Sequence, residues 1–305
     1  AMQTVFETVE SLAGTLATAF VMGESGTGKE LAARAIHQLS ARAPGPFVVV
    51  DCAALAAEQL ERALFGDARG GGLVAEAAAG TLFLDEVCSL SFDAQSTLLR
   101  LIQYGTYRPV GSSQEVAADV RIIASTNRDP LFEMREGRLR EDLYYRLHVV
   151  PLRMPPVRER SDDVLLLAQG FLAQVAEEEG KVASQLSDAA AHALQHYSWP
   201  GNVRQLENTI RQLVLRGPAD EIDEAAVYRV ISGTEIAVET DGASEPSAGF
   251  GGSESDTAIE PLWITEKKAI KAAIAACDGS VNRAAQQLQV APSTIYRKIQ
   301  SWKGQ

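Results

Sequence analysis

The chain has 305 residues, of which 46% are hydrophobic and 22% charged, so it can bury a sizeable core divided into about two or three units. No apolar stretch is long enough to span a bilayer, and the first residues lack the charged-then-apolar order of a secretory signal. We therefore expect a cytoplasmic protein with no membrane partner. The net charge of −12 argues against a protein that binds nucleic acid along its whole surface. The chain begins at Ala1, which leaves open that an upstream domain has been removed.

Apolar segments of strand character alternate with segments of helical periodicity up to about Met154. Strands are predicted at 17–22, 47–50, 81–84, 120–124 and 149–152, and helices at 30–40 and 91–103. This alternation predicts an α/β unit over residues 1–154, with a parallel sheet covered by helices.

A glycine-rich segment directly follows the first predicted strand. It reads Gly23-Glu24-Ser25-Gly26-Thr27-Gly28-Lys29, and Glu30 continues into a helix. Glycines let successive N–H groups point inward, the helix N-terminus adds positive partial charge, and Lys29 supplies a mobile cation for the outer phosphates. The segment therefore predicts a site for a nucleoside triphosphate.

The third predicted strand ends in two carboxylates, Asp85 and Glu86. This arrangement is typical of sites that hold a metal-bound water and polarise an attacking one. Either motif alone could be a coincidence. The alternative for the first motif is a glycine-rich turn that binds nothing. Together the two motifs favour hydrolysis of a nucleoside triphosphate at a site that also holds a metal ion.

Beyond Pro155 the strand pattern gives way to helical periodicity at 162–180, 187–197, 203–216 and 221–231, which predicts a helical unit over 155–232. Residues 233–261 are rich in Gly, Ser, Glu, Asp and Ala without a repeating apolar pattern, so they predict a flexible linker. The three cysteines are far apart and have no C-x-x-C spacing, which indicates ordinary reduced thiols.

Residues 262–305 return to helix-forming sequence, and positions 266–305 carry seven basic and two acidic residues. Helices at 262–277 and 281–288 and a third beginning at Ser293 predict an all-α helix-turn-helix unit that binds DNA. We expect Ser293, Thr294 and Arg297 near bases. Phosphate contacts are expected from Arg283, Tyr296 and Lys298. The alternative is a small helical interaction module, which the positive charge disfavours.

Four motifs stand in order along the chain, at 23–30, 81–86, 140–147 and 199–206. Together they resemble the AAA+ domain of bacterial enhancer-binding proteins, the ATP-driven activators of sigma-54 RNA polymerase. The resemblance covers nearly the whole chain, and segments 87–90, 110–113 and 263–267 favour a quorum-sensing branch of that family, downstream of a two-component signal. It implies an AAA+ ATP-binding domain over 1–154, a helical lid over 155–232 and a helix-turn-helix domain over 262–305.

The resemblance also implies roles for single residues. Lys29 and its loop would bind the β- and γ-phosphates of ATP, while Asp85, on Mg²⁺ through water, and Glu86 would manage the metal and the attacking water. Asn127 would detect the γ-phosphate, with a strand-terminal cap as the alternative. Arg204 would contact nucleotide of its own subunit, unless it forms a salt bridge with Glu207.

Arg140 and Arg146 match the pair that reaches the ATP of a neighbouring subunit, although without the family they could equally be surface charges on a helix. The assignment requires a homo-oligomer, by family analogy a closed ring of about six or seven subunits. The DNA-binding module dimerises in this family, so the target would be a near-palindromic DNA site. RNA polymerase would be a further partner.

The sequence departs from the family pattern at several places. Glu30 replaces the Ser or Thr of the general phosphate loop, as is common in this family, and Gln289 replaces a turn glycine. Asp51 stands where the family has an asparagine that restrains the catalytic glutamate, which predicts slow hydrolysis. Between Gly66 and Gly80 the GAFTGA loop that touches sigma-54 is missing.

Without that loop, contact with sigma-54 polymerase is doubtful. Either the protein regulates transcription by another route, through sigma-70 polymerase or by repression, or the loop was deleted and bridged with glycines. The runner-up function is a DNA-binding scaffold that binds nucleotide but scarcely hydrolyses it. A helicase loader or unfoldase is disfavoured by the helix-turn-helix end.

Overall fold

The computed structural model describes residues 2–67, 70–181, 185–216, 221–239 and 270. All of these except residue 270 belong to one compact unit, residues 1–242. The predicted helix-turn-helix domain and the linker residues 240–261 lie outside the described residues. In the part of the chain that is described, no helix is both long and apolar enough to cross a membrane.

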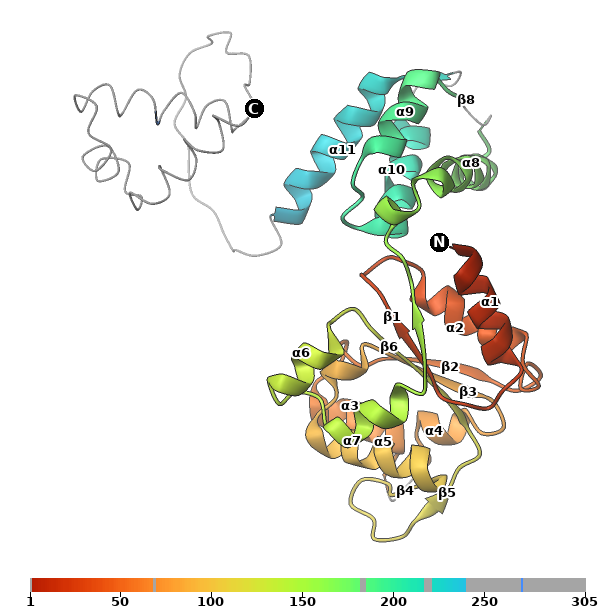
Figure 1. Cartoon of the computed structure of the whole chain (residues 1–305), viewed down its shortest axis with the longest axis vertical. Helices are drawn as coiled ribbons and strands as arrows, with labels where there is room; N and C mark the ends of the chain where they lie inside the picture. Colours follow the sequence, from red (N-terminus) through yellow and green to blue (C-terminus); the bar gives the residue numbers. More distant parts are fainter. Residues whose placement is uncertain (1, 68–69, 182–184, 217–220, 240–269, 271–305) are drawn as a thin grey trace. The chain divides into compact units, whose positions relative to one another are not determined.

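A five-stranded parallel sheet in the order β2-β3-β6-β1-β7 forms the centre of this unit (Figure 1). Its strands are β1 (Ala19–Met22), β2 (Phe47–Asp51), β3 (Thr81–Asp85), β6 (Arg121–Thr126) and β7 (Val150–Arg153). The predicted strands and the α/β class are thus confirmed. Asp51 is paired in register with Asp85, so the carboxylates that end β2 and β3 meet at one edge of the sheet.

Helices cover both faces of the sheet, which agrees with the nearly continuous burial of β1, β3 and β6. They are α1 (Met2–Ala13), α2 (Lys29–Gln38), α3 (Ala57–Phe65), α4 (Leu73–Glu76), α5 (Phe92–Tyr104), α6 (Pro130–Arg135) and α7 (Glu141–Leu147). Phe83 and Ile123 face a cluster with α1 and α2, whereas their neighbours Leu82, Leu84 and Ile122 face α3, α5 and α7. A small hairpin of β4 (Thr106–Tyr107) and β5 (Val116–Ala117) follows α5.

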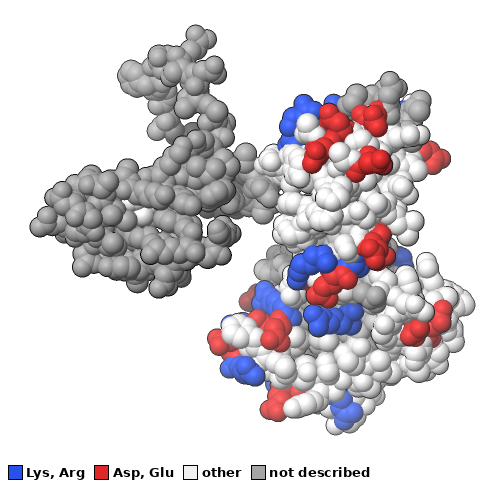
Figure 2. All heavy atoms as spheres, turned by 45° about the horizontal axis from the view of Figure 1, so that its top comes forward, with Lys and Arg blue, Asp and Glu red and all other residues white. Residues whose placement is uncertain are grey.

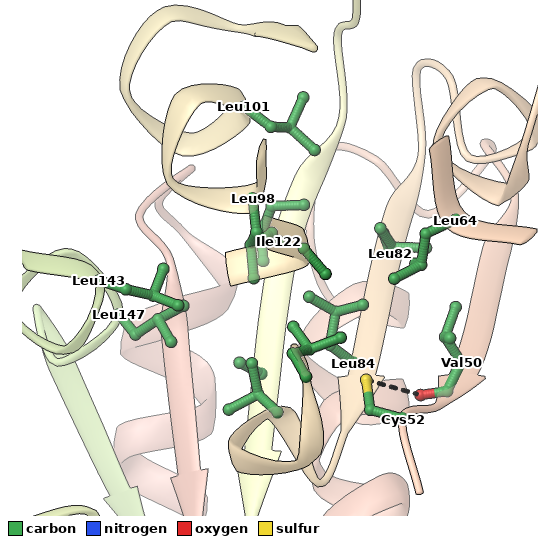
Figure 3. Close-up of a cluster of buried hydrophobic side chains, with 14 of the residues drawn as sticks. Val50, Cys52, Leu64, Leu82, Leu84, Leu98, Leu101, Ile122, Leu143 and Leu147 are labelled. Carbon is green, nitrogen blue, oxygen red and sulfur yellow. Dashed lines mark hydrogen bonds between the residues drawn. The ribbon is translucent and has the colours of Figure 1, made fainter. Parts of the chain in front are cut away.

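Leucine is the most frequent residue in the larger of the two clusters (Figure 3). Leu82 and Leu84 of β3 pack there with Leu64 of α3, Leu98 of α5 and Leu147 of α7, all at most 1% exposed. Each such side chain contributes about 1.5–3 kcal/mol when buried. This packing holds the carboxyl end of β3, and therefore Asp85 and Glu86, in a fixed position. The nearby Cys52 and Cys88 are buried free thiols, as predicted.

The helical unit after β7 is also present. It consists of α8 (Ser161–Glu178), α9 (Asp188–His196), α10 (Asn202–Arg216) and α11 (Glu224–Glu239), packed around the fully buried Trp199. The predicted helix at 221–231 was wrong at both ends. Residues 221–222 form the strand β9 (Glu221–Ile222), which pairs with β8 (Gln185–Leu186), and the helix runs on to Glu239. A glycine inside a helix lowers helix stability by only about 1 kcal/mol relative to alanine, so Gly233 does not end α11. The linker that was expected to begin at Gly233 therefore does not begin there.

Candidate nucleotide-binding site

The glycine-rich loop connects β1 to α2 at the carboxyl edge of the sheet. Gly26 and Gly28 have φ angles of 76° and 95°, in the left-handed region that glycine adopts without strain. The Gly23 N–H donates to the carbonyl of Thr126 (3.3 Å), and the Thr27 hydroxyl donates to the carbonyl of Glu24 (2.8 Å). The loop is thereby closed on itself beside β6, and the N-terminus of α2 faces the space in front of the sheet.

A cavity of about 400 Å³ lies at this edge, within the size range of small-molecule sites. Its lining includes the predicted site residues Ser25, Gly26, Gly28, Lys29, Glu30, Asp85, Glu86, Asn127 and Arg204. The lining does not include Gly23, Glu24 or Thr27, nor either of the two predicted intersubunit arginines. Residues from three of the four motifs, 23–30, 81–86 and 199–206, are thus brought together with Asn127 in one cavity.

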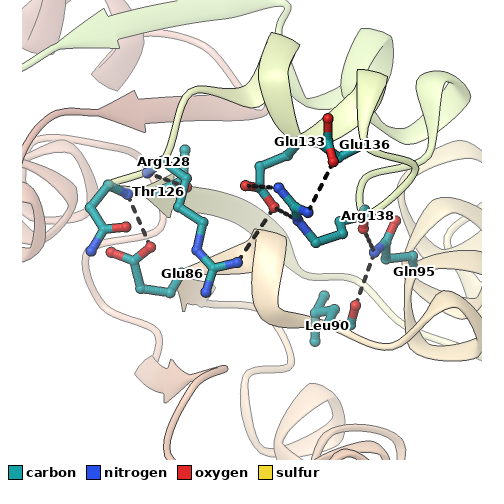
Figure 4. A network of polar contacts seen from close by, with 9 residues as sticks. Glu86, Leu90, Gln95, Thr126, Arg128, Glu133, Glu136 and Arg138 are labelled. Atoms are coloured by element: carbon teal, nitrogen blue, oxygen red, sulfur yellow. Dashed lines mark hydrogen bonds and ion pairs between the residues drawn. The ribbon is translucent and has the colours of Figure 1, made fainter. Parts of the chain in front are cut away.

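Lys29 and Glu86 form the centre of the cavity's polar contacts. The Lys29 ammonium donates to the carbonyls of Gly23 (3.1 Å) and Glu24 (3.4 Å) and pairs with Glu86 Oε1 at 3.4 Å. Glu86 Oε2 accepts the backbone N–H of Asn127 at 3.0 Å (Figure 4). Glu86 itself has φ 56°, which is uncommon for a residue with a side chain and recurs at functional sites.

The β2–β3 side of the cavity is acidic. Asp85 accepts a hydrogen bond from the Ser125 hydroxyl, and Asp51 accepts the Ala53 N–H at 2.9 Å. With Glu86, three carboxylates line this side. The described residues contain no group of three or more His, Cys, Asp or Glu side chains placed to hold a metal ion by themselves. Mg²⁺ is usually held by one or two carboxylates together with substrate phosphates, so this donor set fits Mg²⁺ that arrives with a nucleotide.

Arg204 lines the cavity from the first turn of α10. Among the described residues its side chain has no hydrogen-bond or ion-pair partner, so the alternative of a salt bridge with Glu207 is not formed. A guanidinium in this position is available to an anionic ligand.

Arg140 directly precedes α7 and Arg146 lies in its last turn, and neither lines this cavity. Arg146 is exposed in the last turn. Arg140 donates two hydrogen bonds to the Asp142 carboxylate (3.0 and 2.8 Å), and these lower the pKa of Asp142. It donates a third hydrogen bond to the Ser96 hydroxyl (3.0 Å). Arg140 lines a separate cavity of about 580 Å³ with Phe92, Glu141, Asp142 and Tyr145. Within one chain, neither arginine reaches the nucleotide cavity.

Four residues that sequence reasoning did not select hold predicted site residues in place. Ser125 holds Asp85, Gln95 holds the backbone of Arg140, and Arg158 and Asn202 bind the side chain of Glu24. Only Asn202 lay inside a recognised motif, and the others had no signal that sequence alone could give. The predicted DNA contacts Arg283, Ser293, Thr294, Tyr296, Arg297 and Lys298 lie outside the described residues.

Acidic and basic side chains are interspersed on the face of the described residues that Figure 2 shows. Among the described residues, Arg138 pairs with Glu133 at 2.7 Å, and Arg211 pairs with Glu178 at 2.9 Å. This face therefore lacks the continuous basic surface expected of a nucleic-acid interface.

Comparison with known families assigns each section of the chain. Residues 1–153 match the family described as "Sigma-54 interaction domain", and residues 158–242 match "AAA+ ATPase lid domain". Residues 261–302 match "Bacterial regulatory protein, Fis family", a helix-turn-helix type. The chain belongs to the bacterial transcription regulators with a sigma-54 interaction domain. The expected AAA+ fold, lid and C-terminal helix-turn-helix of this family are thereby confirmed.

Individual members of the family match almost the whole chain. Regulatory protein LuxO of Vibrio parahaemolyticus is 45% identical over 312 residues, covering 99% of this chain and 68% of the relative. Transcriptional regulatory protein ZraR of Klebsiella oxytoca is 40% identical over 308 residues, covering 98% and 66%. The chain thus spans about two thirds of the length of these relatives. The similarity to LuxO confirms the expected placement near the quorum-sensing branch.

A solved structure of the same architecture is the crystal structure of NtrX from Brucella abortus in complex with ATP. It superposes with a TM-score of 0.74 at 35% identity, covering 98% of this chain and 67% of that one. NtrX has also been crystallised with ADP, and that structure gives a TM-score of 0.73. Nucleotide binding is therefore supported for this fold at the level of the family.

Proposed function

We propose that this chain is an ATPase that regulates transcription, assembles through its nucleotide site and binds a near-palindromic DNA site through its C-terminal domain. The observation that carries the proposal is the convergence of Lys29, Asp85, Glu86 and Arg204 on one cavity, from α2, from the end of β3 and the residue after it, and from α10. Each supplies a group that phosphoryl transfer needs: cations for the phosphates, a carboxylate for the metal and a carboxylate for the water.

Each residue of the cavity has a distinct part in the proposed reaction. The loop N–H groups and Lys29 would bind the outer phosphates, and Arg204 would bind them from the lid. Asp85, oriented by Ser125, would hold Mg²⁺ through water, and the ion would neutralise charge on the phosphate oxygens. Glu86 would orient and polarise the attacking water, while Asn127, whose N–H holds Glu86, would detect the γ-phosphate.

Arg140 and Arg146 complete the site only between subunits. Both are outside the cavity of their own chain, and a guanidinium is the group that best offsets charge on a transferring phosphoryl group. We therefore propose that one subunit supplies them to its neighbour in a closed ring of about six or seven subunits. Hydrolysis then depends on assembly.

The second candidate function is a DNA-binding scaffold that holds nucleotide with little turnover. Asp51 favours it, because a third carboxylate beside Asp85 and Glu86 adds negative charge where the phosphates must bind. The shortened segment between Gly66 and Gly80 bears on the polymerase partner. We propose that this chain contacts RNA polymerase without a GAFTGA loop, so that its action need not depend on sigma-54.

Phosphate release at increasing protein concentration separates the two functions. A hydrolysing ring predicts a specific activity that rises with protein concentration and is lost in Lys29→Ala and Arg140→Ala. Arg135→Ala is the matched control, because Arg135 is an exposed arginine of α6 outside the cavity. A specific activity that does not change with concentration would refute the intersubunit role, and undetectable release with tight ATP binding would favour the scaffold.

DNA binding and polymerase choice need their own assays. Arg297→Ala is expected to abolish a mobility shift of a palindromic promoter fragment, and an unchanged shift would refute the assigned contact. Transcription in vitro with sigma-54 and sigma-70 polymerases in parallel tests the partner. Activation restricted to sigma-54 promoters would refute the proposed independence of sigma-54.

A further inference from the structure

The phosphate loop is held on its outer side by the segment that leads into the lid and by the lid itself. The carbonyls of residues 25–27 each accept one hydrogen bond, from Asn202 Nδ2 (3.0 Å), the Val203 N–H (2.9 Å) and Arg160 Nη2 (3.2 Å), in that order. In a loop that binds phosphate through inward N–H groups, the carbonyls must point outward. These three bonds fix the carbonyls in that orientation.

The side chain of Glu24 takes part in the same contacts. Arg158 binds its carboxylate with two parallel hydrogen bonds of 2.6 and 2.9 Å, and Asn202 Nδ2 adds a third of 3.1 Å. Hydrogen bonds from Arg158 and then Asn202 lower the pKa of Glu24 to about 2, so the carboxylate is ionised at neutral pH. The side chain of Glu24 thus binds Arg158 and Asn202 and does not line the nucleotide cavity.

Asn202 is built into the fold at this point. It is fully buried with φ 53°, and its Oδ1 accepts the N–H of Val157 at 2.9 Å. Close approach is also required beside it, because a Cβ on Gly26 would lie 2.4 Å from the carbonyl oxygen of Gly201. Residues 199–204, which lead into and begin α10 and are called the lid elbow below, therefore have little freedom to move independently of the loop.

We propose that Glu24, Arg158 and Asn202 form a clamp that fixes the phosphate loop to the lid, and that Glu24 is a positioning residue that does not touch nucleotide. The proposal rests on the proposed function only in taking the loop as the phosphate site. Preorganised N–H groups bind an anion at a lower entropic cost than mobile ones. Movement of the lid elbow is transmitted through Asn202 to Glu24 and to the carbonyl of Ser25.

A double-mutant cycle on ATP affinity tests the clamp. Glu24→Ala and Arg158→Ala are each expected to raise the Kd for ATP about tenfold, because each removes the same charged pair and loosens the loop. The double variant is expected to be no weaker than either single one. Turnover at saturating ATP should stay within about twofold of wild type, since neither residue lines the cavity.

Arg211→Ala is the matched control. Arg211 pairs with Glu178 at 2.9 Å between α10 and α8, with an exposure close to that of the Arg158–Glu24 pair, but it has no contact with the loop. Its Kd for ATP should equal that of wild type. Additive effects of Glu24→Ala and Arg158→Ala would mean that Glu24 binds nucleotide directly, and unchanged affinity in both would mean that the pair does not position the loop. Either outcome overturns the proposal.

Hydrogen exchange separates this proposal from the proposed function. In full-length protein without added nucleotide, Arg158→Ala should speed the exchange of residues 24–28 and 199–204, whereas Arg211→Ala should not. If wild type binds no ATP but this acceleration occurs, the clamp stands and the ATPase proposal falls. If exchange of the loop is unchanged in Arg158→Ala, the clamp is refuted whatever the affinity of the wild type.

Discussion

Gln95 connects the start of α5 to the segment that precedes Arg140, and its replacement should both destabilise the protein and slow hydrolysis. The side chain is completely buried and all of its polar atoms are used. Figure 4 shows its bonds to Leu90 and Arg138. Nε2 donates to the carbonyls of Leu90 (2.9 Å) and Arg138 (2.8 Å), and Oε1 accepts the N–H of Arg140 (2.9 Å).

In Gln95→Leu two carbonyls and one N–H lose their partner. An unsatisfied buried polar group costs about 1–3 kcal/mol. The bond to Leu90 is buried, whereas the other two are partly buried and their backbone groups can be reached by water. The expected loss of unfolding free energy is therefore about 3 kcal/mol, which for a unit of this size lowers Tm by about 6–12 °C.

Gln103→Leu provides the control, because Gln103 lies on the same helix but is exposed. Its effect should stay within about 0.5 kcal/mol. Thermal unfolding followed by circular dichroism measures both variants, and phosphate release measures the consequence for Arg140. Gln95→Leu should keep its ATP affinity and lose turnover, since only the intersubunit arginine is displaced. Equal Tm values for the two variants would refute the assigned role of Gln95.

Three further predictions concern the nucleotide cavity and the loop beside it. Asp51→Asn removes one of three neighbouring carboxylates and should increase phosphate release at saturating ATP; an equal or lower rate would contradict the inhibitory role of Asp51. The folded-state pKa of Glu24 is about 2 against an ordinary 4.5, so its stabilisation is complete above pH 4.5 and lost as the pH falls toward 2. The difference in unfolding free energy between wild type and Glu24→Gln should narrow as the pH falls from 4.5 toward 2. A difference that stays constant over this pH range would contradict the lowered pKa of Glu24. Glu86→Gln should bind ATP more tightly while losing hydrolysis, as equilibrium binding and phosphate release would show.

Local signals explain why much of the fold could be predicted from the sequence. The strands of the sheet are continuous apolar runs, and the loop after β1 has glycines where two left-handed φ angles are needed. Short amphipathic helices such as α3, with Leu60 and Leu64 buried one turn apart, have too few residues for a clear period. α1 was overlooked although Val5, Val9 and Leu12 follow helical spacing.

The clamp around Glu24 could not be predicted, because its partners are distant in the sequence. Arg158 is 134 positions away and Asn202 is 178 positions away. A phosphate-loop motif defines the backbone path but not where a side chain of the loop points, so Glu24 was assigned to the nucleotide on the motif alone. The same limit applies to Gln95, whose importance follows from what it holds rather than from its own chemistry.

The Glu86→Gln prediction rests on a change of ion-pair partner at Lys29, from Glu86 to the bound triphosphate. Lys29 and Glu86 pair at 3.4 Å with side chains only 8% and 15% exposed, so each strongly compensates the charge of the other. A triphosphate that binds Lys29 must compete with Glu86, and once it does, Glu86 retains only the N–H of Asn127 and becomes available to water. Removing the Glu86 charge eliminates the competitor, so ATP should bind more tightly although the group that polarises water is gone. Weaker binding in Glu86→Gln would mean that Glu86 supports the nucleotide site rather than competing with it for Lys29.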